Sequence, residues 1–113
     1  MKIGGNKNAL LQVKSSVSTN EIGEKVPTWA TLIELIGWLD ESGQSTNSND
    51  YLTKKEESTH FFICDYFEIT KDIKKVENKR MLIDDEVYQV LLIDDPMNLH
   101  NHIEIYLKYV GGQ

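Results

Sequence analysis

The amino-acid sequence predicts a mainly β protein, built as a small antiparallel β-barrel or β-sandwich of five to six strands. Most apolar stretches are short and bounded by turn residues, and residues 102–110 alternate between apolar and polar side chains. A chain of 113 residues is long enough for one modest hydrophobic core. We therefore expect a single domain over residues 1–113, with flexible termini at residues 1–7 and 111–113.

Two strands are expected in the first third of the chain. Residues 9–17 mix apolar and β-branched positions, residues 18–25 are rich in turn formers, and Pro27 is expected to break the chain. Residues 29–39 fit two patterns. A strand places alternate residues on opposite faces, whereas a helix places four apolar residues on one face. We favour the strand, because this segment contains Gly37 and two tryptophans and because the later strands need partners. The helix pattern rests on Leu32, Leu35, Ile36 and Leu39.

Four further strands are expected in the second half, and two of them form a short hairpin. Residues 60–67 are bulky and aromatic on both faces, which is typical of a central strand. Residues 80–83 and 87–94 have hairpin-like spacing around a short acidic turn, and residues 94–96 break the chain. Alternation predicts that Ile103, Ile105, Leu107 and Tyr109 face inward, and that His102, Glu104, Tyr106 and Lys108 face outward.

Residues 42–58 form a long polar stretch that contains almost nothing to bury. A loop of this length in a small domain is either an insertion without a role or a segment that orders on meeting a partner. One short helix elsewhere in the chain remains compatible with the pattern. On the second interpretation of the loop, the contact residues are Asp50, Tyr51, Leu52, Lys54 and Lys55.

The net charge of −6 is concentrated at the end of the chain. Residues 84–113 hold six acidic residues and one basic residue, which accounts for −5 of the total. A general nucleic-acid binder presents a basic face that neutralises phosphates, so the composition argues against that class. It leaves room for a surface that must avoid holding nucleic acid.

No pattern in the sequence indicates an enzyme, a metal centre or a cofactor. His100 and His102 have a spacing that metal sites use, with Asp94, Asp95 or His60 as further ligands, but solvent-facing histidines are the better interpretation. Phosphate-binding, nucleophile-elbow and zinc-protease motifs are absent from the sequence, and the acidic clusters are interpreted as solvated turns.

The remaining features are those of a soluble protein made in a reducing cytoplasm. Cys64 lies in an apolar run, where a small buried hydrophobic side chain is expected rather than a nucleophile. No stretch of the sequence has the length of apolar residues that a membrane-spanning helix needs.

The order of these features resembles that of the small head–tail joining proteins of tailed bacteriophages, also called head-completion or head-closure proteins. A tryptophan-containing strand precedes a polar loop, an aromatic strand follows, and a basic-apolar strand and a tyrosine-containing strand make a hairpin. An Asp-Pro corner and an amphipathic strand complete the pattern. The segments concerned are residues 29–33, 42–58, 60–66, 79–83, 86–90, 93–96 and 103–107.

The resemblance implies a structural subunit that assembles as a dodecameric ring below the portal of a DNA-filled head. Such a ring closes the DNA channel and docks the tail. The implied location is the head–tail interface of the virion, after assembly in the bacterial cytoplasm. Its partners would be further copies of itself, a portal-side adaptor and a tail-completion protein, with DNA only as the transiting genome and no membrane.

Charge placement suggests which residues would serve this role. Part of the acidic set would face the channel, and a basic stretch would contact the acidic part of a neighbouring subunit. The expected channel-facing residues are Asp84, Asp85, Glu86, Asp94 and Asp95, and the expected inter-subunit residues are Lys74, Lys75, Lys79 and Arg80.

Two other functions fit the same pattern. The first is a tail-completion or tail-terminator protein of the phage neck. The second is a small β-barrel that binds single-stranded DNA or a ligand through Trp38, Tyr66 and Tyr106. The lack of a basic groove argues against the second.

Overall fold

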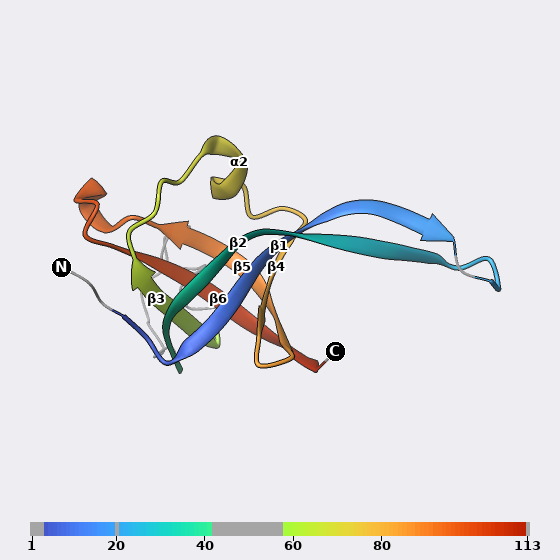
Figure 1. Cartoon of the computed structure of the whole chain (residues 1–113), viewed down its shortest axis with the longest axis horizontal. Helices are drawn as coiled ribbons and strands as arrows, with labels where there is room; N and C mark the ends of the chain where they lie inside the picture. The colour runs from blue at the N-terminus through green and yellow to red at the C-terminus, as the bar shows by residue number, and fades with distance from the viewer. Residues whose placement is uncertain (1–3, 20, 42–57, 113) are drawn as a thin grey trace.

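Six β-strands account for most of the chain in the computed structural model, which describes residues 4–19, 21–41 and 58–112 (Figure 1). Two short helical segments, α2 (Lys71–Lys74) and η1 (Pro96–Asn98), lie in the connections. The strands are β1 (Lys7–Thr19), β2 (Lys25–Glu41), β3 (His60–Asp65), β4 (Lys79–Ile83), β5 (Glu86–Asp94) and β6 (His102–Gly112).

The six strands close into one barrel in the order β1-β2-β3-β6-β5-β4. Every neighbouring pair is antiparallel. This confirms the predicted mainly β fold and, of the two predicted forms, gives the barrel. No helix in the described part of the chain is long and apolar enough to span a membrane.

The strand interpretation of residues 29–39 is confirmed, because the segment lies within β2. Leu35 and Gly37 are buried, whereas Leu32 and Ile36 are exposed. Gly37 is needed for a close approach to β3. A Cβ atom at this position would lie 2.3 Å from the carbonyl oxygen of Ile63 and 2.7 Å from the ring of Phe62.

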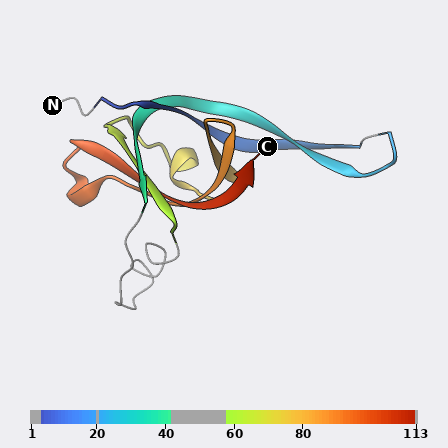
Figure 2. The same cartoon turned by 90° about the horizontal axis from the view of Figure 1, so that it is seen from below.

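Pro27 does not break the chain as predicted, because it lies inside β2 opposite Val17 of β1. The reason is its place in the sheet. Around Pro27, β2 pairs with β1 along one edge, and its pairing with β3 along the other edge begins only at Gly37. A proline is tolerated where its nitrogen faces an edge without a partner, because no ladder hydrogen bond is then lost. The β1–β2 hairpin therefore continues well beyond the barrel (Figures 1 and 2).

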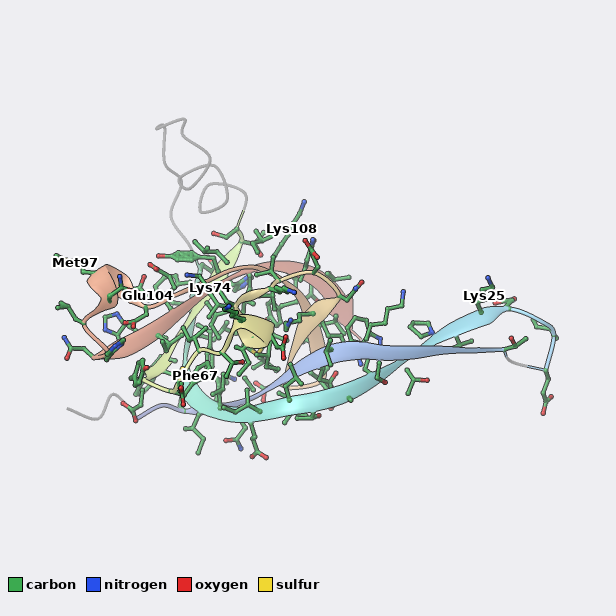
Figure 3. All side chains as sticks on the ribbon, turned by 90° about the horizontal axis from the view of Figure 1, so that it is seen from above. Lys25, Phe67, Lys74, Met97, Glu104 and Lys108 are labelled. Carbon is green, nitrogen blue, oxygen red and sulfur yellow. The ribbon has the colours of Figure 1, made fainter. Side chains whose placement is uncertain are left out.

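The barrel interior is filled by side chains from all six strands, among them Leu11, Phe62 and Ile105, each 0% exposed. Cys64 is 1% exposed, which confirms it as a small buried hydrophobic residue, and burial raises the pKa of its thiol to about 12. The connection between β3 and β4 adds four partly buried side chains that pack on this core. They are Phe67 (labelled in Figure 3), Ile69, Ile73 and Val76.

The β4–β5 hairpin forms as predicted, with a two-residue loop of Asp84 and Asp85. Both residues have positive φ values, of 50° and 62°, as this tight turn requires, and aspartate tolerates that conformation better than most residues. The inward prediction for Tyr109 is wrong, since this residue is 45% exposed. It lies near the end of β6, where its ring packs 5.4 Å from that of Tyr88.

Candidate functional site

The most prominent surface feature is an arm formed by residues 14–19 and 21–29 of the β1–β2 hairpin. In the described part of the chain, β1 pairs with β4 only through residues 9–13 and β2 pairs with β3 only through residues 37–41, so the arm is a two-stranded ribbon. It projects along the longest dimension of the molecule, which measures 48 Å (Figure 1). Near its tip, Ile22 is 79% exposed and Val26 is 39% exposed.

A set of contacts at the base of the arm fixes its direction. The guanidinium of Arg80 lies 4.4 Å from the centre of the Trp29 ring, and its Nε donates a 2.8 Å hydrogen bond to Oε1 of Gln12. Nε2 of Gln12 in turn donates to Oγ1 of Thr31 at 3.2 Å. The arm thus leaves the barrel at a junction of polar and aromatic side chains. A two-stranded ribbon in water is at best marginally stable by itself, so these contacts at the base support the arm.

The four predicted inter-subunit basic residues do not form one surface. Arg80 is half-buried at the arm junction, and burial lowers the pKa of its guanidinium. Lys79 is buried and its Nζ donates to the carbonyl of Lys75, while burial lowers its pKa. Lys74 and Lys75 are exposed at the end of α2, whose first turn is capped by the Thr70 hydroxyl. Two of the four cations are therefore engaged within the chain.

The five predicted channel-facing acids fall into two groups at opposite ends of β5. Asp84, Asp85 and Glu86 lie at the β4–β5 turn, whereas Asp94 and Asp95 lie at the far end of β5. A nine-residue strand separates the groups by roughly 30 Å. The acids therefore line both ends of the barrel rather than one patch.

Two residues at the β4–β5 turn are tied to neighbouring strands. Oδ2 of Asp84 lies 2.5 Å from Nζ of Lys7, and this hydrogen bond raises the pKa of the lysine. Oε2 of Glu86 accepts a 2.6 Å hydrogen bond from the hydroxyl of Tyr109, which raises the pKa of the tyrosine. Asp85 is exposed at the tip of the turn.

At the other end of β5, Asp95 bonds to His100 and so holds together the corner that contains η1, where the backbone is strained. Its carboxylate lies 2.5 Å from Nδ1 of His100 and accepts a 3.1 Å hydrogen bond from the backbone N–H of the same residue. Met97, Asn98 and His100 all have positive φ values. The corner carries Met97 into solvent with 86% of its surface exposed, and a cleft of about 360 Å³ opens beside it, lined by Tyr66, Lys74, Asp94, Asp95 and His100 among others.

The two histidines considered as metal ligands bond to different carboxylates. His100 contacts Asp95, and Nε2 of His102 lies 2.9 Å from Oε2 of Glu104. Within the residues that the structure describes, no group of three or more histidine, cysteine or acidic side chains is placed to hold a metal ion. The geometry at this corner is that of paired structural contacts.

The aromatic residues considered for nucleic-acid stacking are dispersed. Trp38 stands on the outer face of β2 with 45% of its surface exposed. Tyr66 packs 4.6 Å from the ring of His100, and Tyr106 stacks on Phe61 and donates to Glu104 at 2.7 Å. The predicted partner-contact residues Asp50, Tyr51, Leu52, Lys54 and Lys55 lie outside the described residues, so their role stays a prediction.

Sequence reasoning missed the arm. A signal was present beside the proline, because the β-branched residues Val26 and Thr28 flank Pro27 and are typical of a strand that continues into the barrel part of β2. Because Pro27 is expected to end the strand, the sequence does not predict that β1 and β2 extend beyond the length that a barrel of this size requires.

Comparison with known proteins gives one informative similarity. No protein-family model and no curated protein matches this sequence. Its fold is similar to that of a chain in a solved structure described as the virion of a native gene transfer agent (GTA) particle, with a TM-score of 0.55 and 10% sequence identity. The match covers 95% of this chain and 96% of that chain, so the similarity extends over the whole fold.

Proposed function

We propose that this protein is a structural component of a virion, and specifically a subunit of the connector between head and tail. In this role copies form a ring below the portal, close the DNA channel and provide the surface on which the tail docks. The observation that carries the proposal is the fold shared over nearly the whole chain with a component of a virion particle.

The architecture suits a subunit of a mechanical assembly. A closed barrel has no open sheet edge within its wall, so it resists deformation and unwanted strand pairing. The arm adds the opposite property, because it projects beyond the barrel and presents exposed Ile22, in the connection between its strands, and exposed Val26 of β2. A rigid body with one projecting arm can reach a neighbouring subunit without unfolding any part of its core.

Charge supplies a reason for the acidic composition. A channel for DNA must not retain phosphates, because each lysine or arginine contact would hold the duplex electrostatically. Exposed Asp85 at one end of the barrel and half-buried Asp94 at the other both offer negative charge to a channel. Whichever end of the barrel faces the lumen, an acidic group lies at it.

The partners follow from the proposed position. They are further copies of this chain in a ring, a portal-side adaptor above and a tail-completion or tail protein below, with DNA as the transiting genome. The location is the head–tail interface of the finished particle. The chemistry required is adhesion between protein surfaces, and the proposal assigns no catalytic residue.

Inactivating the gene provides the test. We expect DNA-filled heads that lose their genome and carry no tails, together with free tails of normal length, and electron microscopy with an antibody should label the neck of wild-type particles. Heads that keep their DNA beside tails of irregular length would instead support a tail-terminator role. Labelling of the capsid shell or the tail fibres would overturn the connector assignment.

A further inference from the structure

The outer wall of the barrel has an apolar stripe on β2, which continues onto Ile63 of β3. On β6 the outward positions carry His102, Glu104, Tyr106 and Lys108, which are mostly polar, as expected for a wall facing water. On β2 the outward positions instead carry Leu32, 44% exposed, and Ile36, 57% exposed, followed by Trp38. An antiparallel strand with one solvated face does not need apolar residues there, so this face has the composition of an interface.

Acidic residues surround the stripe. Glu34 and Asp40 share the outer face of β2 with Ile36 and both are exposed. The register places Trp38 opposite Ile63 of β3 and Ile63 opposite Glu104 of β6, so one row of outward side chains ends in a carboxylate. We call this surface the acidic wall, and it consists of Glu34, Ile36, Trp38, Asp40, Ile63 and Glu104.

A second surface has an apolar centre and basic residues. The register aligns Arg80 of β4 with Gln89 of β5, and Gln89 with Lys108 of β6, in one outward row. Beside this row lies a hollow of about 280 Å³, whose lining includes Trp29, Arg80, Val87 and Val110. We call this surface the basic wall, and it consists of Trp29, Arg80, Val87, Gln89, Lys108 and Val110.

The two walls are centred on opposite sides of the barrel. In the closed order β1-β2-β3-β6-β5-β4, β2 stands across from β5 and β3 stands across from β4. The acidic wall is centred on β2 and β3, and the basic wall on β4 and β5. Two strands contribute to both walls. Strand β6 has Glu104 toward one end and Lys108 toward the other (Figure 3), and β2 adds Trp29, at the base of the arm, to the basic wall. The acidic turn of Asp84 and Asp85 lies beyond the end of the basic wall.

We propose that the acidic wall of one copy of this chain packs against the basic wall of the next. Both walls have apolar residues at their centre, and the charged residues on the two walls are of opposite sign. Opposite charges on facing surfaces steer and orient protein association. A symmetric pairing of two acidic walls would instead place like charges together. A contact between unlike faces on opposite sides of one subunit is heterologous, and repeated contacts of this kind close into a ring or extend as a filament.

This inference rests on the proposed function in one respect, since a connector ring is what brings many copies together. It deepens that function by naming which faces meet. It also explains why the sequence-predicted basic residues divide as they do. Arg80, although it bonds to Gln12 of its own chain, also lines the basic wall, whereas Lys79 is buried and donates to the carbonyl of Lys75.

Cross-linking in the full-length chain tests the contact. Ile36→Cys places a thiol on the acidic wall and Val110→Cys places one on the basic wall, at positions that are 57% and 64% exposed. The double variant is treated with a short bis-maleimide, both as purified protein at high concentration and within assembled particles. The two single variants are matched controls, and the wild type controls for Cys64, whose buried thiol has a raised pKa.

We expect the double variant to give a ladder of multimers and each single variant to remain monomeric. Dimers from a single variant would show like faces meeting and would overturn the inference. The inference would also be overturned if the double variant gave no ladder in solution and none in particles that contain the protein at the neck. That result would leave the connector role intact. Absence of the protein from the neck would remove the connector role, and a ladder in solution would then still support the contact.

Exchange of charges gives a second measurement that does not depend on cross-linking geometry. Glu34→Lys with Asp40→Lys makes the acidic wall basic, and Gln89→Glu with Lys108→Glu makes the basic wall acidic, all at exposed positions. Each variant alone should lose at least tenfold in association measured by sedimentation. An equal mixture of the two should recover it, because each contact then joins opposite charges. A mixture that associates no better than either variant alone would contradict the proposal.

Discussion

Replacing Gly37 with alanine is the sharpest test of the barrel geometry. The added Cβ would lie 2.3 Å from the carbonyl oxygen of Ile63 and 2.7–2.8 Å from two ring carbons of Phe62. The first of these atoms is backbone in a paired strand and the second belongs to a fully buried ring, so neither can move without separating β2 from β3. Overpacking in a core costs about 1–3 kcal/mol, and a clash with backbone belongs at the upper end of that range.

A smaller effect opposes this cost. Alanine loses less backbone freedom on folding than glycine does, which favours Gly37→Ala by about 0.5–1 kcal/mol. The steric term is larger, so we expect a net destabilisation of about 2 kcal/mol and a melting temperature lower by roughly 10 °C for a domain of this size. Urea unfolding followed by tryptophan fluorescence measures the free energy, and circular dichroism gives the melting temperature.

Gly112→Ala is the matched control. At this position the nearest atom to an added Cβ is a carboxylate oxygen of Glu86, 3.8 Å away, which is ordinary contact. The control should therefore unfold within about 0.5 kcal/mol of the wild type, as surface substitutions usually do. If Gly37→Ala matched the control, β2 and β3 would not approach as closely as the structure places them, and the closed barrel would be in doubt.

Three further predictions concern the core, the thiol and the channel. Phe62→Ala should cost about 3–5 kcal/mol in urea unfolding because this ring is fully buried, whereas Trp38→Ala, on the outer wall, should leave an isolated subunit within about 1 kcal/mol of the wild type. With a pKa of about 12, Cys64 stays a thiol through pH 9, so Ellman's reagent should react with it only as fast as the chain unfolds; rapid native-state labelling would contradict its burial. Asp85→Lys with Asp94→Lys should slow DNA release from particles without preventing neck assembly, and unchanged release kinetics would count against a channel-facing position.

Most of the fold could be predicted from local pattern. The alternation in residues 102–110 and the spacing around Asp84 and Asp85 identify β6 and the β4–β5 hairpin, because side-chain period and turn length are local properties. The closure of the barrel is different. It depends on pairing β1 with β4 and β3 with β6, which are contacts between distant segments that no local pattern specifies. The place of Pro27 within a strand could not be predicted locally either, because a strand accepts a proline only where one of its edges has no partner strand.

The candidate surfaces show the same division more clearly. The sequence shows that most of the net negative charge lies in residues 84–113. In the barrel, however, Asp84 and Asp94 lie at opposite ends of β5. The charges that complement one another across the molecule emerge only from register. One row joins Arg80, Gln89 and Lys108 across three strands, and the row from Trp38 through Ile63 to Glu104 joins three strands across a gap in sequence.

A head-to-tail assembly needs this arrangement rather than a net charge. An overall charge of −6 repels every copy from every other, and it weakens association at low salt. Local complementarity overcomes that repulsion only where opposite charges surround matching apolar centres and water is excluded between them. In the proposed connector, acidic ends on the barrel and opposite charges on its walls would therefore serve different contacts. The ends would offer negative charge to the DNA channel, and the walls would hold one copy to the next.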